Sequence, residues 1–170
     1  MPGQTAAAFR ADSAQTAALA PELARLYPCL VLEGTPLADV WRAGGYAPWP
    51  LAAAVDELAA ALLTLWAAGV RVGRIGLAEQ EGLTVLAGPR HPALGQMARA
   101  RALLLRVRRA LGERDREAAS GAAAQAGLLL VPRRLQGEAL GQKGALAADY
   151  AALGLRVRFW DEPDLAICAG

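Results

Sequence analysis

Basic side chains are the residues whose type and spacing in this sequence suggest chemistry. Between positions 99 and 109 the chain carries five arginines and no acidic residue. Like charges three or four residues apart on a helix repel by a few tenths of a kcal/mol, roughly, so an anionic partner would stabilise the segment. Phosphate groups are such a partner. The residues that we expect to contact nucleic acid are Arg99, Arg101, Arg106, Arg108 and Arg109.

Aromatic side chains gather in a loop nearer the N-terminus. Trp41, Tyr46 and Trp49 lie in or beside residues 42–50, where two Gly and two Pro exclude regular structure. Aromatic rings beside a basic patch can stack on unpaired bases, so Trp41 and Trp49 are further predicted nucleic-acid contacts. Two alternatives remain: the rings anchor a protein interface, or the loop covers the core.

Three carboxylates cluster near the C-terminus at Asp161, Glu162 and Asp164. Such a group can hold a hard divalent cation, which leaves a metal-dependent enzyme as an alternative function. No companion acidic motif accompanies it, and His91 is the single histidine. We therefore predict no catalytic residue, no metal site and no cofactor.

The two cysteines, Cys29 and Cys168, each lie within an apolar run and form no CxxC motif. This spacing excludes a zinc site or a thioredoxin-type motif, and the apolar surroundings predict two buried, reduced thiols. The N-terminus has no signal-peptide pattern, and the most apolar window, residues 51–68, is periodic and contains acidic residues. We expect a cytoplasmic protein without a membrane span. Its 17 Arg and single Lys suggest a bacterial genome rich in GC.

Charge is distributed unevenly along the chain. Residues 1–85 carry 5 basic and 8 acidic side chains, whereas residues 86–170 carry 13 basic and 8 acidic ones. The arginines of the second half therefore have three candidate partners: nucleic acid, an acidic protein surface, or acids of the first half. The last group comprises Glu22, Glu33, Asp39 and Asp56.

Hydrophobic periodicity predicts the helices. Apolar residues repeat at helical spacing over residues 51–68 and 92–118, and again over residues 138–153. Leu19, Leu23 and Leu26 share that spacing, which predicts a helix closed by Pro28.

Short apolar runs predict the strands. Residues 70–77 and 83–87 suggest a hairpin whose first strand is interrupted by a bulge at Gly73, where the apolar parity switches. Further strands are expected at 29–33, 128–131, 155–160 and 165–168. A strand, helix and strand over residues 128–160 favours parallel pairing. We therefore predict one α/β or α+β domain over residues 1–170, in which a single mixed sheet of about four to six strands is flanked by three or four helices. Residues 1–12 are expected to be loosely ordered.

One stretch resembles the protein kinases. LVLEGTPL at residues 30–37 looks like the kinase hinge, and LLTLWAAGV at residues 62–70 is similar to the helix that leads into the catalytic loop. VGR at 72–74 stands where the catalytic His-Arg-Asp pattern belongs, and LAG at 86–88 lacks the metal-binding Asp. The resemblance therefore implies no catalytic residue and, at most, an inactive relative.

These observations favour a non-enzymatic bacterial binding protein. Its Arg-rich helix would contact an anionic partner, which is nucleic acid in the first instance or else an acidic protein surface. A protein-interaction or regulatory module, such as an inactive kinase relative, is the first alternative. A metal-dependent enzyme built on Asp161, Glu162 and Asp164 is the second.

Overall fold

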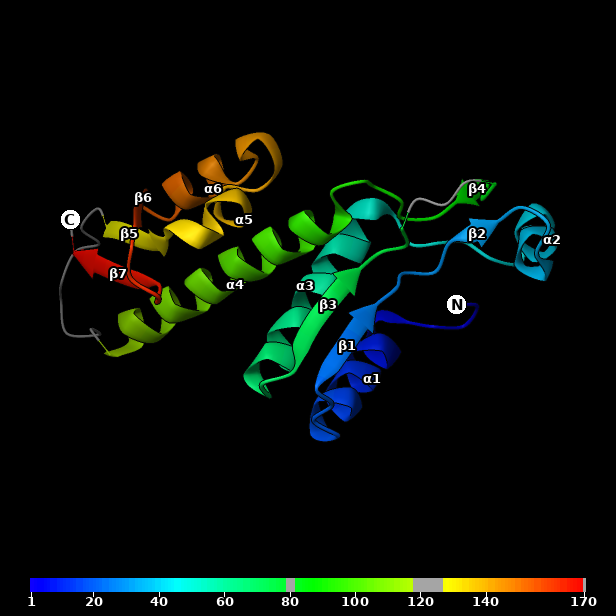
Figure 1. The fold of residues 1–170 in the computed structure, drawn as a ribbon, viewed down its shortest axis with the longest axis horizontal. Coiled ribbons are helices and arrows are strands. Elements are labelled where there is room, and N and C mark those ends of the chain that lie inside the picture. The colour runs from blue at the N-terminus through cyan, green and yellow to red at the C-terminus, as the bar shows by residue number, and fades with distance from the viewer. Residues whose placement is uncertain (79–81, 118–126, 170) are drawn as a thin grey trace. The chain divides into compact units, whose positions relative to one another are not determined.

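The computed structural model describes residues 1–78, 82–117 and 127–169 (Figure 1). These residues form two compact units, 1–98 and 99–170. Within them lie six α-helices and three small sheets of two, two and three strands. The protein is thus α+β, as predicted, but the described residues contain no single sheet of four to six strands.

Two helices pack together in the first unit. They are α1 (Ala6–Ala18) and α3 (Leu51–Ala67), and the second agrees with the predicted helix at 51–68. The apolar positions of α3 repeat at helical spacing and give it a buried face that includes Leu58, Leu62 and Leu65. Arg10 of α1 donates two hydrogen bonds to the carboxylate of Glu57 on α3, from Nε to Oε2 at 2.7 Å and from Nη2 to Oε1 at 2.6 Å.

Strands β1 (Leu23–Leu26) and β3 (Arg71–Ile75) form a parallel pair in the same unit. The predicted helix through Leu19, Leu23 and Leu26 is therefore wrong. α1 ends at Ala18, Ala20 has a positive φ of 45°, and Pro21 follows, so the helix cannot continue. Of the three leucines, Leu19 caps the end of α1, whereas Leu23 and Leu26 lie in β1, which pairs with a segment far along the chain.

The predicted bulge at Gly73 is confirmed. The register pairs Ala24 with Val72 and then Arg25 with Arg74, so Gly73 is the extra residue. Its lack of a side chain matters, because a Cβ there would lie 2.9 Å from Cδ1 of Leu23.

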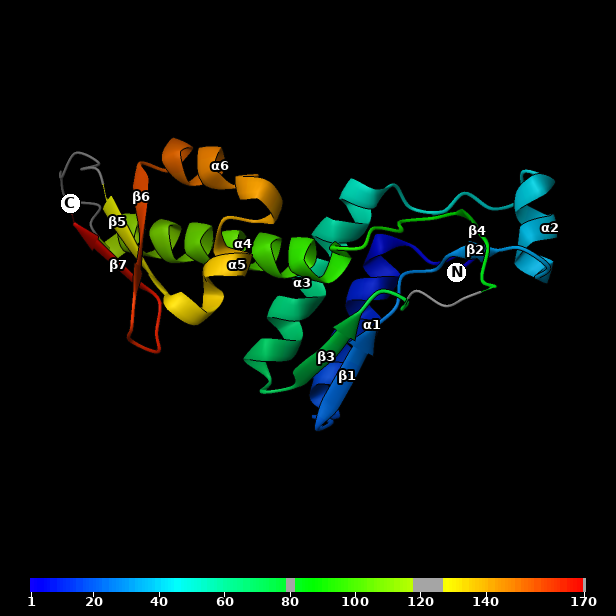
Figure 2. The same ribbon diagram turned by 45° about the horizontal axis from the view of Figure 1, so that its top comes forward.

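A second small sheet pairs β2 (Val31–Leu32) with β4 (Val85–Ala87) in antiparallel fashion, and α2 (Pro36–Arg42) follows β2 (Figure 2). The predicted hairpin between 70–77 and 83–87 is wrong, because β3 and β4 each pair with an earlier strand. The Gly76 N–H donates to the Leu26 carbonyl at 2.8 Å and ties the end of β3 to β1, after which the chain leaves that sheet.

The long helix α4 (Leu94–Glu117) agrees with the predicted helix at 92–118, and its residues from Arg99 onward belong to the second unit. That unit contains a three-stranded sheet in the order β6-β5-β7. β5 (Gly127–Pro132) pairs in parallel with β6 (Leu155–Trp160), as predicted, and antiparallel with β7 (Ala166–Ala169).

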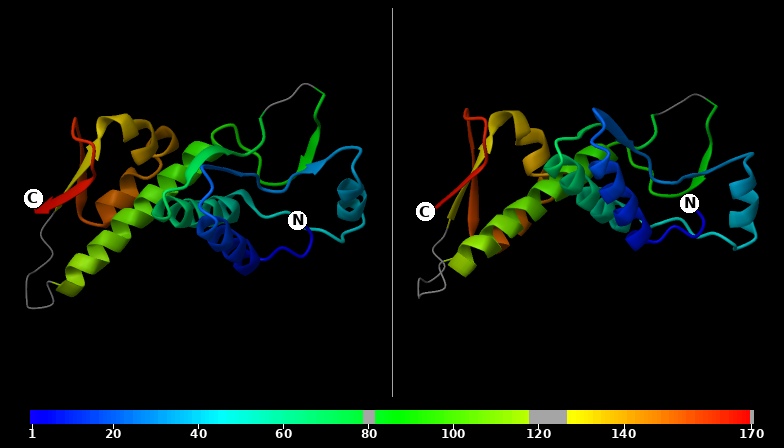
Figure 3. Two further views of the ribbon diagram at one scale, coloured as in Figure 1. Left: turned by 60° about the horizontal axis from the view of Figure 1, so that its bottom comes forward. Right: turned by 90° about the horizontal axis from the view of Figure 1, so that it is seen from below.

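The predicted helix at 138–153 is divided into α5 (Gln136–Ala139) and α6 (Ala147–Ala152). Positive φ values of 70° at Gly141 and 53° at Lys143 break the helical path. Helices α4, α5 and α6 lie on one side of the sheet (Figure 3) and share a core with it. The fully buried members of this core include Leu104, Leu129, Val131 and Tyr150.

No helix among the described residues combines the length and the apolar character that crossing a membrane requires.

Candidate functional site

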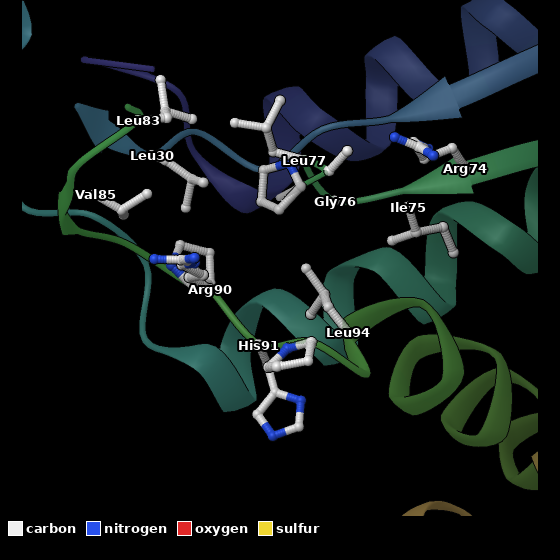
Figure 4. Close-up of a pocket in the computed structure, with 14 residues that line it drawn as sticks. Leu30, Arg74, Ile75, Gly76, Leu77, Leu83, Val85, Arg90, His91 and Leu94 are labelled. Carbon is white, nitrogen blue, oxygen red and sulfur yellow. The ribbon is translucent and has the colours of Figure 1, made fainter. Parts of the chain in front are cut away.

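A pocket of about 370 Å³ lies in the first unit (Figure 4). It lies where the chain leaves β3, returns through β4 and approaches α4. Apolar side chains on its walls include Leu30, Ile75, Leu77, Val85 and Leu94. A cavity of this volume is within the range of small-ligand sites, in which a few polar groups fix the orientation of the ligand.

The polar side chains of this pocket are basic. Arg74 comes from β3, and Arg90 comes from the segment between β4 and α4; both are exposed. In Figure 4 the two arginines lie on opposite sides of the pocket, with Ile75, Leu77 and Leu94 between them. Among the described residues that line the pocket none is acidic. Arg74 and Arg90 are therefore the described side chains of this pocket that could contact an anionic group.

The bulge in β3 places one of these arginines. Val72 is buried and Arg74 is exposed although they are two residues apart, because Gly73 shifts the phase of the strand. The shift also pairs Arg74 with Arg25, another exposed arginine on the neighbouring strand. Like charges on directly paired residues destabilise a sheet, and a bound anion would relieve this repulsion.

The other arginine follows a conformationally restricted turn. Gly88 has a φ of 119°, and a Cβ there would lie 3.0 Å from the carbonyl oxygen of Cys29. Pro89 is buried beside it. This close approach of the backbone to residues 29 and 30 holds Arg90 at the pocket.

His91 borders the pocket at the start of α4. The Ala93 N–H donates to its Nδ1 at 3.0 Å, so in the neutral ring the proton lies on Nε2. In Figure 4 the imidazole extends away from the apolar side chains. The N-terminus of α4, a 24-residue helix, adds the partial positive charge of its helix dipole close by.

The five arginines predicted from the sequence lie on α4 in the second unit. Arg106, Arg108 and Arg109 are exposed, whereas Arg99 and Arg101 are half-buried. Arg108 and Arg99 have acidic neighbours inside their own unit. Nη2 of Arg108 donates to Oδ1 of Asp149 at 2.8 Å, and Nε of Arg99 lies 4.0 Å from Oε1 of Glu138.

Two of the four acids of the first half that seemed available as countercharges have other partners. Glu22 binds Arg71 at 2.6 Å, and Asp39 binds Arg42 at 3.1 Å. Both partners are basic residues of the first unit itself.

The two predicted stacking residues occupy different places in the first unit. Trp41 is half-buried on α2. Trp49 packs edge-on against Phe9 of α1, with ring centroids 5.8 Å apart and an interplanar angle of 89°.

The predicted acidic cluster does not gather around a common point. Asp161 accepts a hydrogen bond from Nε of Arg133 at 3.0 Å, and Nη2 of Arg134 donates to the Pro163 carbonyl at 2.6 Å. Within residues 1–78, 82–117 and 127–169 no group of three His, Cys, Asp or Glu side chains could hold a metal. Cys29 and Cys168 are free thiols, but the prediction that both are buried is wrong, because Cys29 is half-buried and Cys168 is exposed.

Sequence reasoning missed the pocket because its two arginines are 16 positions apart and neither belongs to a basic run. The signals present were the parity switch at Gly73 and the basic pair Arg90 and His91 just before a helix.

A curated relative matches part of the chain. A tRNA uridine(34) acetyltransferase of Methanocaldococcus jannaschii is 37% identical to it over 57 residues, which is 32% of this chain. The chain spans only about a tenth of the length of that relative.

A family comparison covers a larger part. The model of the Radical_SAM C-terminal domain matches residues 21–106, just over half of the chain. All residues that line the pocket fall within this match, as do the residues that resemble a kinase. The chain belongs to the Radical_SAM C-terminal domain family.

Proposed function

We propose that this chain is a non-catalytic RNA-binding module that holds phosphate groups of a tRNA between Arg74 and Arg90. The observation that carries the proposal is the pocket itself, whose walls include the described basic side chains of Arg74 and Arg90. Arginine forms charge-assisted hydrogen bonds to phosphate that are stronger than neutral ones. The helix dipole of α4 acts in the same direction.

The relative supports RNA as the source of the phosphate, because its name specifies a tRNA as its substrate. The match covers only about a tenth of the relative, so we propose for this chain the relative's class of substrate, a tRNA, and not its acetyl transfer. A module that binds RNA would present the substrate to chemistry performed elsewhere.

The exposed arginines of α4 provide a second contact in this proposal. Arg106 would bind a phosphate, while Arg108 would exchange Asp149 for a phosphate oxygen. Exposed ion pairs of this kind contribute only about 0–1 kcal/mol, so a phosphate can displace the carboxylate.

The family description names radical SAM chemistry, which depends on an iron–sulfur cluster. Such clusters are held by several cysteine thiolates. The chain has two cysteines, Cys29 in the first unit and Cys168 in the second, and among the described residues no metal-binding group forms. These residues do not fit a cluster, so no step of the proposed function passes through one.

The cytoplasm is the compartment proposed for this function. Both cysteines are free thiols, which is the usual state of cysteine in reducing compartments.

The proposal is tested by measuring the affinity of the full chain for a tRNA as a function of salt. Each phosphate contact contributes about −0.9 to the slope of log K against log salt on duplex, and about −0.7 on single strands. The double change Arg74→Gln and Arg90→Gln should therefore reduce the slope by about 1.4 to 1.8. It should also weaken binding roughly tenfold at moderate salt, because charge-assisted hydrogen bonds are lost.

A matched control lies on the same strand. Arg71 is exposed like Arg74, but it is paired with Glu22 and does not line the pocket, so Arg71→Gln should leave the slope unchanged. Equal effects of the two changes would contradict a pocket-specific contact. A wild-type chain that binds no tRNA at low salt would rule out the proposed function.

A further inference from the structure

A second cavity, of about 60 Å³, lies in the same unit and has aromatic walls. Four of the nine aromatic residues of the chain line it, namely Phe9, Tyr27, Tyr46 and Trp49. About 10–15 Å³ of such space accommodates one water molecule, so this cavity has room for roughly four to six waters. That is enough for one single-ring group.

The aromatic rings are held by packing on one side and open on the other. Trp49 is fixed by its edge-on contact with Phe9 at 5.8 Å. Tyr27 is 50% exposed, which is unusual for a large side chain beside a cavity. A flat ring that enters from solvent would thus contact Tyr27 first and bury the solvent-exposed apolar surface of its side chain.

Apart from the N-terminal ammonium of Met1, which donates to Oε1 of Gln4 at 3.4 Å, the polar side chains of this cavity carry no formal charge in their ordinary states. They include the amide of Gln4, the hydroxyls of Tyr27 and Tyr46 and the thiol of Cys29. Burial, with a hydrogen bond to Cys29, raises the pKa of Tyr46 to about 12, so its hydroxyl remains protonated at neutral pH. Neutral donors and acceptors are what the edge of a nucleobase requires.

The two cavities adjoin each other. Pro28 and Pro89 line both of them, so the basic pocket and the aromatic cavity lie on either side of these prolines. Aromatic cages also bind cations, but Arg74 and Arg90 next door would repel a cation. A ligand that satisfies both cavities has a flat neutral ring joined to an anionic group.

We propose that the aromatic cavity is a base-binding subsite, which takes one unpaired single-ring nucleobase while the adjoining phosphate lies between Arg74 and Arg90. This inference rests on the proposed function and specifies it: the RNA would be recognised at a single-stranded nucleotide. Stacking on Tyr27 supplies most of the affinity, because base–aromatic stacking contributes about 1–3 kcal/mol per base.

The experiment measures binding of the full chain to a labelled ten-nucleotide oligouridylate and to the same backbone with abasic residues. The base-containing strand should bind about tenfold more tightly. Tyr27→Ala should abolish that difference while leaving the salt slope unchanged, since no charge is removed. Tyr27 is half exposed, so its loss should not unfold the chain, which circular dichroism checks.

Two further variants refine the result. Tyr46→Phe keeps the ring and removes the hydroxyl, and it should weaken binding of the base-containing strand alone. Trp41→Ala is the aromatic control, because Trp41 lies on α2 and does not line the cavity.

The outcomes separate the two proposals. If both strands bind equally and Tyr27→Ala has no effect, the base subsite is wrong, whereas phosphate binding in the basic pocket still stands. If neither strand nor tRNA binds, both proposals are overturned.

Discussion

The hydroxyl of Tyr150 offers a sharp test of the core of the second unit. Tyr150 is 1% exposed, and its Oη is a buried atom for which the described structure provides no hydrogen-bond partner. An unsatisfied buried hydroxyl costs about 1–3 kcal/mol. Tyr150→Phe removes that cost and leaves a gap of roughly 10 Å³, worth about 0.2 kcal/mol at ~24 cal/mol per Å³. The variant should therefore be more stable than the wild type by about 1 kcal/mol or more.

Because this hydroxyl can ionise, the difference in stability between the Tyr150→Phe variant and the wild type should depend on pH. Burial, together with the nearby carboxylate of Asp149, raises the pKa of Tyr150 to about 12, whereas tyrosine in an unfolded chain ionises near pH 10. Between these values the unfolded chain binds fewer protons than the folded one, so wild-type stability falls as pH rises. The upper limit of this loss is about 1.4 kcal/mol per pH unit. Phenylalanine cannot ionise, and its advantage should grow from pH 8 to pH 11.

Urea denaturation followed by far-UV circular dichroism measures both effects. An increased midpoint at an unchanged slope reports a gain in stability rather than a change in the unfolded state. Tyr27→Phe is the control, because Tyr27 is 50% exposed and its hydroxyl can reach water. A Tyr150→Phe protein that is less stable than the wild type at pH 8, with a difference that stays constant to pH 11, would show that the hydroxyl is satisfied.

Two further changes test the first unit. Gly88→Ala should destabilise it by about 1–3 kcal/mol, because a Cβ at a φ of 119° meets the backbone of residues 29 and 30. Gly44→Ala, at a φ of 76° in open space, should cost less in the same thermal melt. Arg10→Ala should lower the urea midpoint and expose α1 to proteolysis, since the buried Glu57 loses both hydrogen bonds. Arg10→Lys should restore part of the midpoint, and equal midpoints for all three proteins would contradict this reasoning.

The elements that could be predicted are those whose pattern is local. α3 and α4 have long amphipathic repeats, and β6 alternates over six residues, so each was predicted almost to its ends. The strands of the first unit could not be assigned partners in this way. β3 and β4 are neighbours in sequence, but each pairs with a strand that precedes α3, and nothing local in the sequence specifies that choice.

The candidate site shows the same division. The basic face of α4 could be predicted from one helical segment, although its local countercharges at Glu138 and Asp149 could not. The pocket between Arg74 and Arg90 depends on two turns and a bulge that bring separate segments together. The bulge and the basic pair before α4 each had a signal in the sequence, but their meeting at one pocket did not.

The bulge residue Gly73 in β3 determines which face of the strand carries the positive charge of Arg74. Residues two apart on a regular strand point to the same side, so a regular strand through residue 73 would turn the guanidinium of Arg74 toward the interior with Val72. Burying a cation in this way carries a large free-energy cost. The bulge therefore lets one short strand give the core an apolar side chain and, two residues later, give the solvent a positive charge.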